Sequence, residues 1–463
     1  MTNPMPTDDT QNNDGLYPTV DIDNASEYAS LTDALEQAGF ENAGFEHTVF
    51  ESFDEGLYIG MMSGTSLDGM DAVICQFTHD NDDANNSPMQ LLATYSQDFP
   101  PRLREALLAL CQPNGVQQLI PQNDEPSSQD GEPNSELDWF GWASRVYSEF
   151  ASEVVNTLLK QANIDAESVL AIGCHGQTVR HRPHMGFTLQ LLDANIIAER
   201  TGISVVSDFR RRDMAVGGQG APLVPAFHQA LFATADTTRV LLNLGGIANI
   251  AVLPATVNHN DNQVVGYDTG PANLLLDAWT ALHINQSYDA GGAWAASGQI
   301  IEPLLTQLLT HRFFDQPYPK STGREDFNLA WLQSELQIFD HVAPNIDYSS
   351  ADVQATLTEL TAISATEQIK LFIGNGLIGN KKITEAVYIC GGGALNDYLM
   401  TRLQTHLPYC VVETTASLGL DPIWVEAVAF AWLARQTLMG ETGNLPAVTG
   451  ANKQVVLGQV CFA

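Results

Sequence analysis

The chain has 463 residues, of which 55 are Asp or Glu and 20 are Lys or Arg, so its formal net charge is −35. A surface this acidic repels the phosphates of nucleic acids and of anionic lipids, which argues against binding to nucleic acid or to a membrane surface. The length predicts two or three domains, and no apolar run approaches the roughly 20 residues that cross a bilayer.

The first residues, MTNPMPTDDT, contain no basic stretch followed by an apolar one, so we expect no secretory signal there. The six cysteines are scattered, without a Cys-x-x-Cys pair. This pattern is typical neither of a disulfide framework nor of a zinc site, and it favours a reducing compartment, the cytoplasm.

Two segments are unusually acidic. Residues 1–55 contain 13 acidic and no basic side chains, and residues 112–138 contain six acidic and no basic ones. The first segment has few clustered aliphatic side chains, too few to offset the entropy of ordering it. We therefore expect a disordered or loosely docked extension at 1–55, and a surface insertion between two helices at 112–138.

After the extension, the hydrophobic pattern indicates alternating strands and helices. Strands are expected at 57–62, 70–77, 91–99, 169–178 (ending in a glycine loop) and 204–209, and helices at 101–110, 137–162 and 195–201. The first two strands flank the turn SGTSLDG, a pattern typical of a β-hairpin.

The second half repeats this order. Strands are expected at 239–246 and 247–254 around a glycine turn, at 264–271, at 387–396 (again ending in a glycine loop) and at 410–415, with helices at 272–282 and 421–438. The repetition predicts a duplicated α/β domain with a ligand cleft between the halves. Two unrelated α/β domains are the alternative.

Three glycine-rich turns follow strands, at Ser63–Gly69, Leu244–Ala248 and Gly391–Ala394. Such turns expose backbone N–H groups, and glycine lets an anion approach the main chain. We interpret the first two as phosphate loops and the third as lying under a nucleoside. The string GNGLIG at 374–379 follows a helix and precedes a strand, the wrong order for a dinucleotide fingerprint, so we expect only a loop there.

Several longer strings carry a family resemblance. They are GMMSGTSLDGMDA (60–72), HGQT (175–178), DFRRRDMAVGGQGAPLVP (208–225), NLGGIAN (243–249), GYDTGPAN (266–273), ICGGGALN (389–396) and GLDPIWVEAVAFAWLA (419–434). Together they resemble the 1,6-anhydro-N-acetylmuramic acid kinases of the sugar-kinase/Hsp70/actin superfamily. The resemblance implies two ribonuclease-H-like α/β domains, at 56–237 and 238–463, with a cleft between them. It does not extend to 1–55 or 112–138.

The resemblance also implies an activity. An enzyme of this family uses ATP and Mg²⁺ to phosphorylate 1,6-anhydro-N-acetylmuramic acid while water opens the anhydro ring, which gives N-acetylmuramic acid 6-phosphate and ADP in cell-wall recycling. The family further implies a homodimer. Two alternatives stay open: a sugar kinase without ring hydrolysis, and an actin-like or Hsp70-like ATPase that drives partner binding.

The resemblance implies an ATP site spread over the three turns. Its residues are Gly64, Thr65, Ser66, Leu67, Asp68, Gly69, Met70, Asp71, Asn243, Gly245, Gly246, Gly391, Gly392, Gly393 and Asn396. Asp68 and Asp71 are expected to hold Mg²⁺ through water, since carboxylates and substrate phosphates are the usual magnesium ligands. Alternatively, Asp68 only stabilises its turn.

Asp268 is the expected catalytic residue, because it ends an apolar strand and should project into the cleft. The resemblance implies that it acts as the base for the attacking water, a role that typically contributes about 10²–10⁴-fold in rate. Its alternative role is to cap the following helix. Glu426 lies among apolar residues of the last helix, so it is either a second functional carboxylate or a partnered one.

The implied substrate carries a lactyl carboxylate, which a protein of this charge must bind through a local cation. Among the few basic residues we expect Arg210 to do so, through its planar guanidinium, unless it pairs with nearby acids instead. Residues 217–222 are expected to close the cleft, to contact the acetamido group of the substrate, or to form a hinge. The other substrate contacts implied are His175, Gln177, Thr178, Gly270, Pro271 and Asn273.

Overall fold

The computed structural model describes residues 53–64, 66–78, 88–120, 133–255, 263–373 and 386–463. Thr65, the loop predicted at 374–379 and nearly all of the acidic extension lie outside the described residues. The last residues of that extension are described, and Asp54 pairs with Arg435. The described part of the acidic insertion at 112–138 connects two helices.

The first sheet has six strands in the order β13-β7-β4-β1-β2-β3. Strands β1, β2 and β3 form an antiparallel meander, while β1, β4 and β7 are parallel and β13 runs antiparallel to β7. The strands are β1 (Gly56–Met62), β2 (Gly69–Phe77), β3 (Met89–Asp98), β4 (Val169–Cys174), β7 (Val205–Ser207) and β13 (Gln459–Cys461).

The second sheet repeats this arrangement in the order β10-β9-β8-β11-β12. Its first three strands are antiparallel, and β8, β11 and β12 are parallel. The strands are β8 (Arg239–Leu244), β9 (Ile247–Leu253), β10 (Val265–Pro271), β11 (Ala386–Cys390) and β12 (Val411–Thr414). The predicted duplicated α/β fold is therefore confirmed. The boundary near residue 237 stays a prediction, and β13, from the end of the chain, joins the first sheet.

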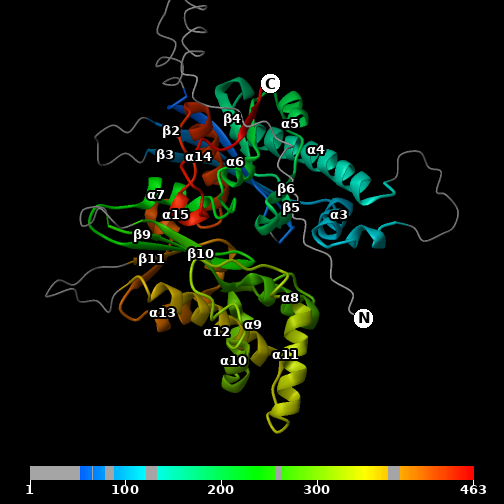
Figure 1. The fold of residues 1–463 in the computed structure, drawn as a ribbon, viewed down its shortest axis with the longest axis vertical. Coiled ribbons are helices and arrows are strands. Elements are labelled where there is room, and N and C mark those ends of the chain that lie inside the picture. Colours follow the sequence, from blue (N-terminus) through cyan, green and yellow to red (C-terminus); the bar gives the residue numbers. More distant parts are fainter. Residues whose placement is uncertain (1–52, 65, 79–87, 121–132, 256–262, 374–385) are drawn as a thin grey trace, which may run out of the picture. The chain divides into compact units, whose positions relative to one another are not determined.

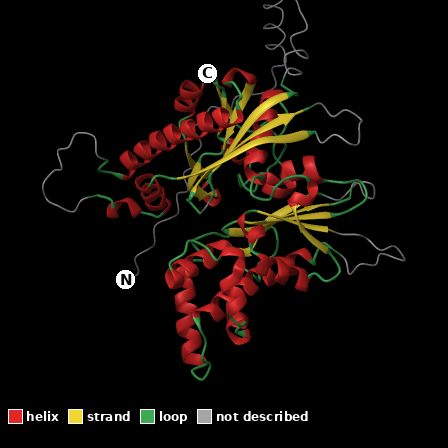
Figure 2. Cartoon of the chain, turned by 180° about the vertical axis from the view of Figure 1, so that it is seen from behind, coloured by secondary structure: helices red, strands yellow, loops and turns green. Residues whose placement is uncertain are grey.

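Helices pack beside both sheets (Figure 2). They are α3 (Pro101–Cys111), α4 (Glu136–Ala162), α5 (Ala194–Thr201), α6 (Phe209–Ala215), α7 (Val224–Phe232), α8 (Asn273–Ile284), α9 (Ala293–Ser297), α10 (Glu302–Leu308), α11 (Leu329–Val342), α12 (Ser350–Ile369), α13 (Asp397–His406), α14 (Val425–Met439) and α15 (Pro446–Thr449). At the second sheet, α12 and α13 lie on one side and α7 and α15 on the other (Figure 1). Among the described residues, no helix is both long and apolar enough to span a membrane.

The sequence analysis left out several of these elements. It contained no prediction for α9 to α12, for the short strand β13, or for the hairpin formed by β5 (Gln177–Arg182) and β6 (Phe187–Leu191). Helices α8, α10, α11 and α12 enclose a hydrophobic cluster of their own. They form an insertion between β10 and β11, a position that is occupied in the first half by α3 and α4.

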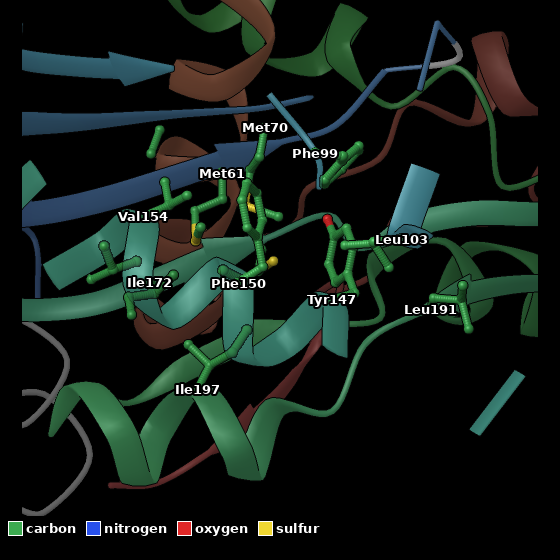
Figure 3. Packing of buried hydrophobic residues seen from close by; sticks show 14 of the residues in the cluster. Met61, Met70, Phe99, Leu103, Tyr147, Phe150, Val154, Ile172, Leu191 and Ile197 are labelled. Carbon is green, nitrogen blue, oxygen red and sulfur yellow. The ribbon is translucent and has the colours of Figure 1, made fainter. Parts of the chain in front are cut away.

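Helix α4 covers the first sheet through side chains spaced three and four residues apart, including Tyr147, Phe150 and Val154 (Figure 3). These pack against Met61 and Met70 of the first two strands. The helix begins at the cap residue Ser135, whose side chain accepts a hydrogen bond from the backbone of Asp138. The packing fixes β1 and β2, and with them the first glycine turn.

Helix α14 approaches the other face of the first sheet closely. A Cβ at Gly60 on β1 would overlap the carbonyl oxygen of Ala427, and one at Gly173 on β4 would overlap that of Phe430. The helix backbone therefore lies directly on two strands, which only glycine allows. This contact brings the first turn of α14, with Glu426, to the ends of β1 and β4.

Replacement of Gly60 by Ala should destabilise the protein by roughly 1–3 kcal/mol, because the added methyl group has no space against the α14 backbone. Chemical denaturation gives the change in free energy of unfolding. The matched control is Gly141→Ala on the exposed face of α4, where nothing lies within 4 Å of the new Cβ. The free energy of unfolding of the Gly141→Ala variant should increase by about 0.5–1 kcal/mol, because alanine favours the helix more than glycine does. Equal effects of the two variants would contradict this view of α14.

Candidate active site

The turn between β1 and β2 is held from outside by two side chains. Arg104 on α3 donates from Nε to the carbonyl oxygen of Leu67 (3.0 Å) and pairs with Asp68 (3.1 Å). Gln177 donates to the carbonyl oxygen of Gly64 (3.3 Å). Leu67 has a left-handed backbone (φ 59°) with its side chain buried in the core. The turn is therefore a fixed structure whose carbonyl groups are engaged by the protein.

The turn between β8 and β9 is held in the same way, by the start of α8. The backbone N–H groups of Ala272 and Asn273 donate to the carbonyl oxygens of Gly246 (3.0 Å) and Gly245 (3.1 Å). The Asn273 side chain donates to the carbonyl oxygen of Leu244 (2.9 Å). Asn273, predicted to contact substrate, therefore has a structural role in shaping this turn.

The third turn packs onto the second. Gly391 has φ 78°, and a Cβ there would overlap Asn243, while a Cβ at Gly393 would overlap the side chain of Leu244. Close backbone packing thus requires both glycines. Asn396, predicted to contact ATP, is largely buried and caps α13 by accepting a hydrogen bond from the backbone of Leu399 (2.9 Å).

Each of the three turns also contains one glycine that is not closely packed against other parts of the protein. At Gly64, Gly245 and Gly392 an added Cβ would meet no atom closer than 3.8, 3.7 and 3.5 Å, respectively. An added Cβ would there make only ordinary van der Waals contact, so one glycine of every turn is not closely packed. Such positions fit the approach of phosphate or ribose groups to main-chain N–H groups, so the residues present fit a nucleotide.

The carboxylates predicted to hold Mg²⁺ are engaged with protein groups. Asp68 is exposed and pairs with Arg104. Burial raises the pKa of Asp71, and the hydrogen bond from Ser96 opposes that shift. Within the described residues, no three His, Cys, Asp or Glu side chains are grouped so that they could hold a metal ion. The magnesium prediction for Asp68 and Asp71 stays a prediction.

Asp268 lies on β10 opposite Asn249 of β9, just before a register shift in the strand. One carboxylate oxygen, Oδ2, accepts hydrogen bonds from the Ser321 hydroxyl and the Thr322 backbone N–H, both at 3.0 Å. Burial raises the pKa of Asp268 to about 6; the two hydrogen bonds oppose the shift, and nearby Glu325 adds to it. Helix α8 has Ala272, not Asp268, at its cap position, so the capping alternative is wrong.

Glu426 is partnered. Its Oε1 lies 3.5 Å from the side-chain nitrogen of Asn243, and burial raises the pKa of its carboxyl group, with Arg210 opposing and Asp71 adding to the shift. The buried Oδ1 of Asn243 has no partner among the described residues. Among those residues, no hydrogen bond links Glu426 to Asp268, so the two predicted catalytic carboxylates belong to separate groups.

Arg210 is bound to protein atoms. Its Nε donates to Nε2 of His175 (3.0 Å), and its Nη1 donates to the carbonyl oxygen of Gly220 (2.7 Å). An arginine only donates, so Nε2 of His175 must be an acceptor. Burial and the charge of Arg210 hold the pKa of His175 well below its usual range. Binding of a substrate carboxylate by Arg210 stays a prediction, and the guanidinium would have to use its remaining donors.

The glycine loop at 217–222 wraps a buried aspartate. Asp213 accepts hydrogen bonds from the backbone N–H of Gly220 (2.8 Å) and from the side chains of Asn444 (2.7 Å) and Thr449 (2.8 Å). A Cβ at Gly218 would overlap the Asp213 carboxylate. The loop is thus tied to the C-terminal segment of the chain, and its glycines are needed for that packing.

A comparison with known protein families matches the part of the chain that contains these site residues. A family model for anhydro-N-acetylmuramic acid kinase matches residues 56–463. The chain belongs to the anhydro-N-acetylmuramic acid kinase family. The match begins directly after the acidic extension, and every predicted site residue lies within it.

Relatives in this family are close. A protein named anhydro-N-acetylmuramic acid kinase from Psychrobacter arcticus is 73% identical over 454 residues, which cover 94% of this chain and 99% of that protein. One of the same name from Shewanella amazonensis is 47% identical, with coverage of 87% and 98%. Among solved structures, a ROK family glucokinase from Streptomyces griseus matches with a TM-score of 0.34 and 11% identity, covering 82% of this chain and 100% of that one.

Sequence reasoning missed the segment at 320–325, KSTGRE, which supplies the hydrogen bonds to Asp268. It also missed Asp277 on α8. Burial raises the pKa of Asp277 to about 7, with Asp68 adding to the shift and Arg324 opposing it. Asp277 and Arg324 therefore lie close enough to the first glycine turn to interact with its charges. The sequence did carry a signal for the segment at 320–325. Lys320 and Arg324 place two of the chain's 20 basic residues within six positions.

Asp277→Asn should stabilise the protein at pH 8. The folded-state pKa of Asp277 lies above the ordinary aspartate value, so the folded state holds a proton that the unfolded chain has lost between about pH 4 and 7. The contribution of Asp277 to the free energy of unfolding therefore falls as the pH rises through that window. The neutral amide of asparagine does not ionise, so the variant avoids this loss. We expect a gain of roughly 1 kcal/mol at pH 8 that shrinks towards pH 5.

Thermal unfolding from pH 5 to pH 8 measures this difference. The control is Asp340→Asn on α11, an exposed carboxylate that accepts a hydrogen bond from Tyr348. A gain at pH 8 that does not shrink at pH 5 would contradict the assigned pKa. A loss of stability at pH 8 would mean that attraction to Arg324 outweighs burial.

Proposed function

We propose that this protein is an ATP-dependent kinase of 1,6-anhydro-N-acetylmuramic acid. In this reaction water opens the anhydro ring and the freed oxygen is phosphorylated, which yields N-acetylmuramic acid 6-phosphate and ADP for cell-wall recycling. The observation that carries the proposal is family membership over residues 56–463, with named relatives up to 74% identical. Asp268, a carboxylate held in the middle of the edge strand β10, supplies the chemistry that the reaction needs.

In the proposed mechanism, Asp268 takes a proton from water. The water oxygen bonds to the anomeric carbon, the bond from that carbon to the bridging oxygen breaks, and the bridging oxygen takes the γ-phosphoryl group of ATP. With a pKa of about 6, the carboxyl group is ionised at neutral pH yet basic enough to accept the proton. The proton then leaves to solvent, so one water is consumed for each phosphoryl transfer.

The glycine turns bind and orient the nucleotide in this proposal. The less closely packed positions at Gly64, Gly245 and Gly392 support it, because an added Cβ there would meet no atom closer than 3.5 Å and a ligand group can approach the backbone. Mg²⁺ bound with ATP would neutralise charge at the phosphates, and Asp68 and Asp71 are the carboxylates that would hold it through water. Arg104 fixes the turn that carries Asp68.

We also propose that the enzyme is cytoplasmic and homodimeric. The buried thiols of Cys75, Cys174 and Cys390 support a reducing compartment, and burial raises the pKa of each thiol. The homodimer rests on family resemblance. Sedimentation of the purified protein would test it.

Product analysis tests the reaction itself. Incubation with ATP and 1,6-anhydro-N-acetylmuramic acid in ¹⁸O-labelled water should give a sugar phosphate with one ¹⁸O at the anomeric position and one ADP per sugar. Mass spectrometry within minutes of mixing, against the exchange rate of authentic product, measures this incorporation. A phosphorylated sugar without label would favour a kinase that does not hydrolyse the ring. ATP hydrolysis equal with and without sugar would favour an ATPase module.

Asp268→Asn should lower kcat by roughly 10²–10⁴-fold while ATP affinity is unchanged, because the amide cannot take a proton but keeps an oxygen for Ser321 and Thr322. In the unmodified enzyme, kcat/KM should fall as the pH drops below about 6, where Asp268 becomes protonated. Steady-state kinetics and nucleotide titration measure the two effects. Asp340→Asn is the matched control, and near-normal kcat in Asp268→Asn would refute the assigned role.

A further inference from the structure

The segment at 320–322 runs alongside β10 and bonds to a single residue of it three times. The backbone N–H of Asp268 donates to the carbonyl oxygen of Lys320 (3.0 Å). The Ser321 hydroxyl and the Thr322 backbone N–H both donate to Oδ2 of Asp268 (3.0 Å each). The segment therefore grips the backbone and one side-chain oxygen of Asp268 together.

This segment is itself anchored on its far side. The buried Lys320 ammonium donates to the carbonyl oxygens of Phe313 and Phe314, both at 3.2 Å, and lies over the Phe313 ring. The Thr322 hydroxyl donates to Oδ2 of Asp326 (2.9 Å). Because the donors to Asp268 are held by these contacts, they form a stiff support and not a loop that adapts to the carboxylate.

The two oxygens of Asp268 are thereby made unequal. Oδ2 has two donors, whereas Oδ1 has no hydrogen-bond partner among the described residues. A carboxylate fixed through its backbone N–H and one oxygen has little freedom to rotate. The second oxygen keeps its lone pairs for a group that is not part of the protein.

The charges around Asp268 are few. Glu325 is exposed, and its negative charge favours the protonated form of the Asp268 carboxyl group. The Lys320 ammonium is turned to the two phenylalanine carbonyls, and Asn249, opposite on β9, is uncharged. The α12 side chains that reach β10 are uncharged: Ser364 lies near Gly270, Thr361 donates to the carbonyl oxygen of Pro271, and Gln368 accepts from Tyr267. The two hydrogen bonds thus lower the pKa of Asp268, and the Glu325 carboxylate raises it.

We propose that Ser321 is a positioning residue for the reaction, which holds Asp268 so that Oδ1 alone faces the attacking water. This inference rests on the proposed role of Asp268 as the base. Ser321 and the Thr322 backbone fix the direction of the free lone pairs, and Glu325 increases the proton affinity of the carboxylate.

A purely structural role is the competing interpretation, in which Asp268 only anchors the loop. The pH dependence of kcat/KM distinguishes the two, because loop anchoring alone does not move the pH at which activity is lost. Ser321→Ala removes a donor to the ionised carboxylate and should shift the acid limb upward by roughly one pH unit. Glu325→Gln removes a repelling charge and should shift it downward by roughly a few tenths of a unit, less at high salt.

Three further variants complete the experiment on the full chain. Ser321→Thr keeps the hydroxyl at an exposed position, so the pH at which kcat/KM falls in acid should return to that of the unmodified enzyme. Ser297→Ala is the matched control, since this exposed serine bonds only to the carbonyl oxygen of Trp294. Thr322→Val removes a hydroxyl that bonds Asp326 and leaves the backbone N–H to Asp268, so its limb should move less than that of Ser321→Ala.

Opposite shifts in Ser321→Ala and Glu325→Gln, with rescue by Ser321→Thr, would support the proposal. Unmoved limbs in folded, active variants, or shifts in one common direction, would overturn it. Failure of the underlying function is separately visible: Asp268→Asn would then remain active, or the unmodified enzyme would form no labelled sugar phosphate.

Discussion

The backbone contact between α14 and the first sheet is the constraint on which the rest of the site depends. Glycine at Gly60 and Gly173 lets the helix lie directly on β1 and β4. The helix comes from the end of the chain, so this contact joins the last part of the sequence to the first sheet. It also sets Glu426 within hydrogen-bonding range of Asn243 on the second sheet. One side-chain hydrogen bond thus joins α14, which packs on the first sheet, to β8 of the second sheet.

A second constraint is the shortage of cations. The chain has 20 basic residues, and several of those in the interior are bound to protein atoms. Arg210 bonds His175 and Gly220, Lys320 bonds two carbonyl groups, and Arg402 forms a two-pronged pair with Glu359. An anionic ligand must therefore be met largely by backbone N–H groups. Glycine turns whose carbonyls are already engaged from outside, by Arg104 and by the start of α8, present such groups without repelling oxygens.

The sequence predicted what depends on local pattern. Strand and helix order and the duplicated topology follow from hydrophobic periodicity and glycine position. The expectation that Asp268 ends a strand is wrong, because β10 continues to Pro271. The supports of Asp268 could not be predicted, because Ser321 and Thr322 are separated from it by more than fifty residues and carry no periodic signal of their own. Arg210 shows a different limit of prediction from sequence. Its guanidinium group suggested contact with a ligand carboxylate, but in the fold it is buried and donates to His175.

The balance at Asp268 explains why a base would be built this way. Burial alone would raise the pKa of a carboxyl group until it held its proton at neutral pH, and an exposed aspartate would be too weak a base. Two donors on one oxygen reverse part of the effect of burial, and the resulting pKa of about 6 lies between these limits. Because both donors bind the same oxygen, the correction fixes orientation as well as proton affinity. In the proposed role of Asp268 as a base, the same hydrogen bonds that favour the ionised group would also decide which oxygen acts.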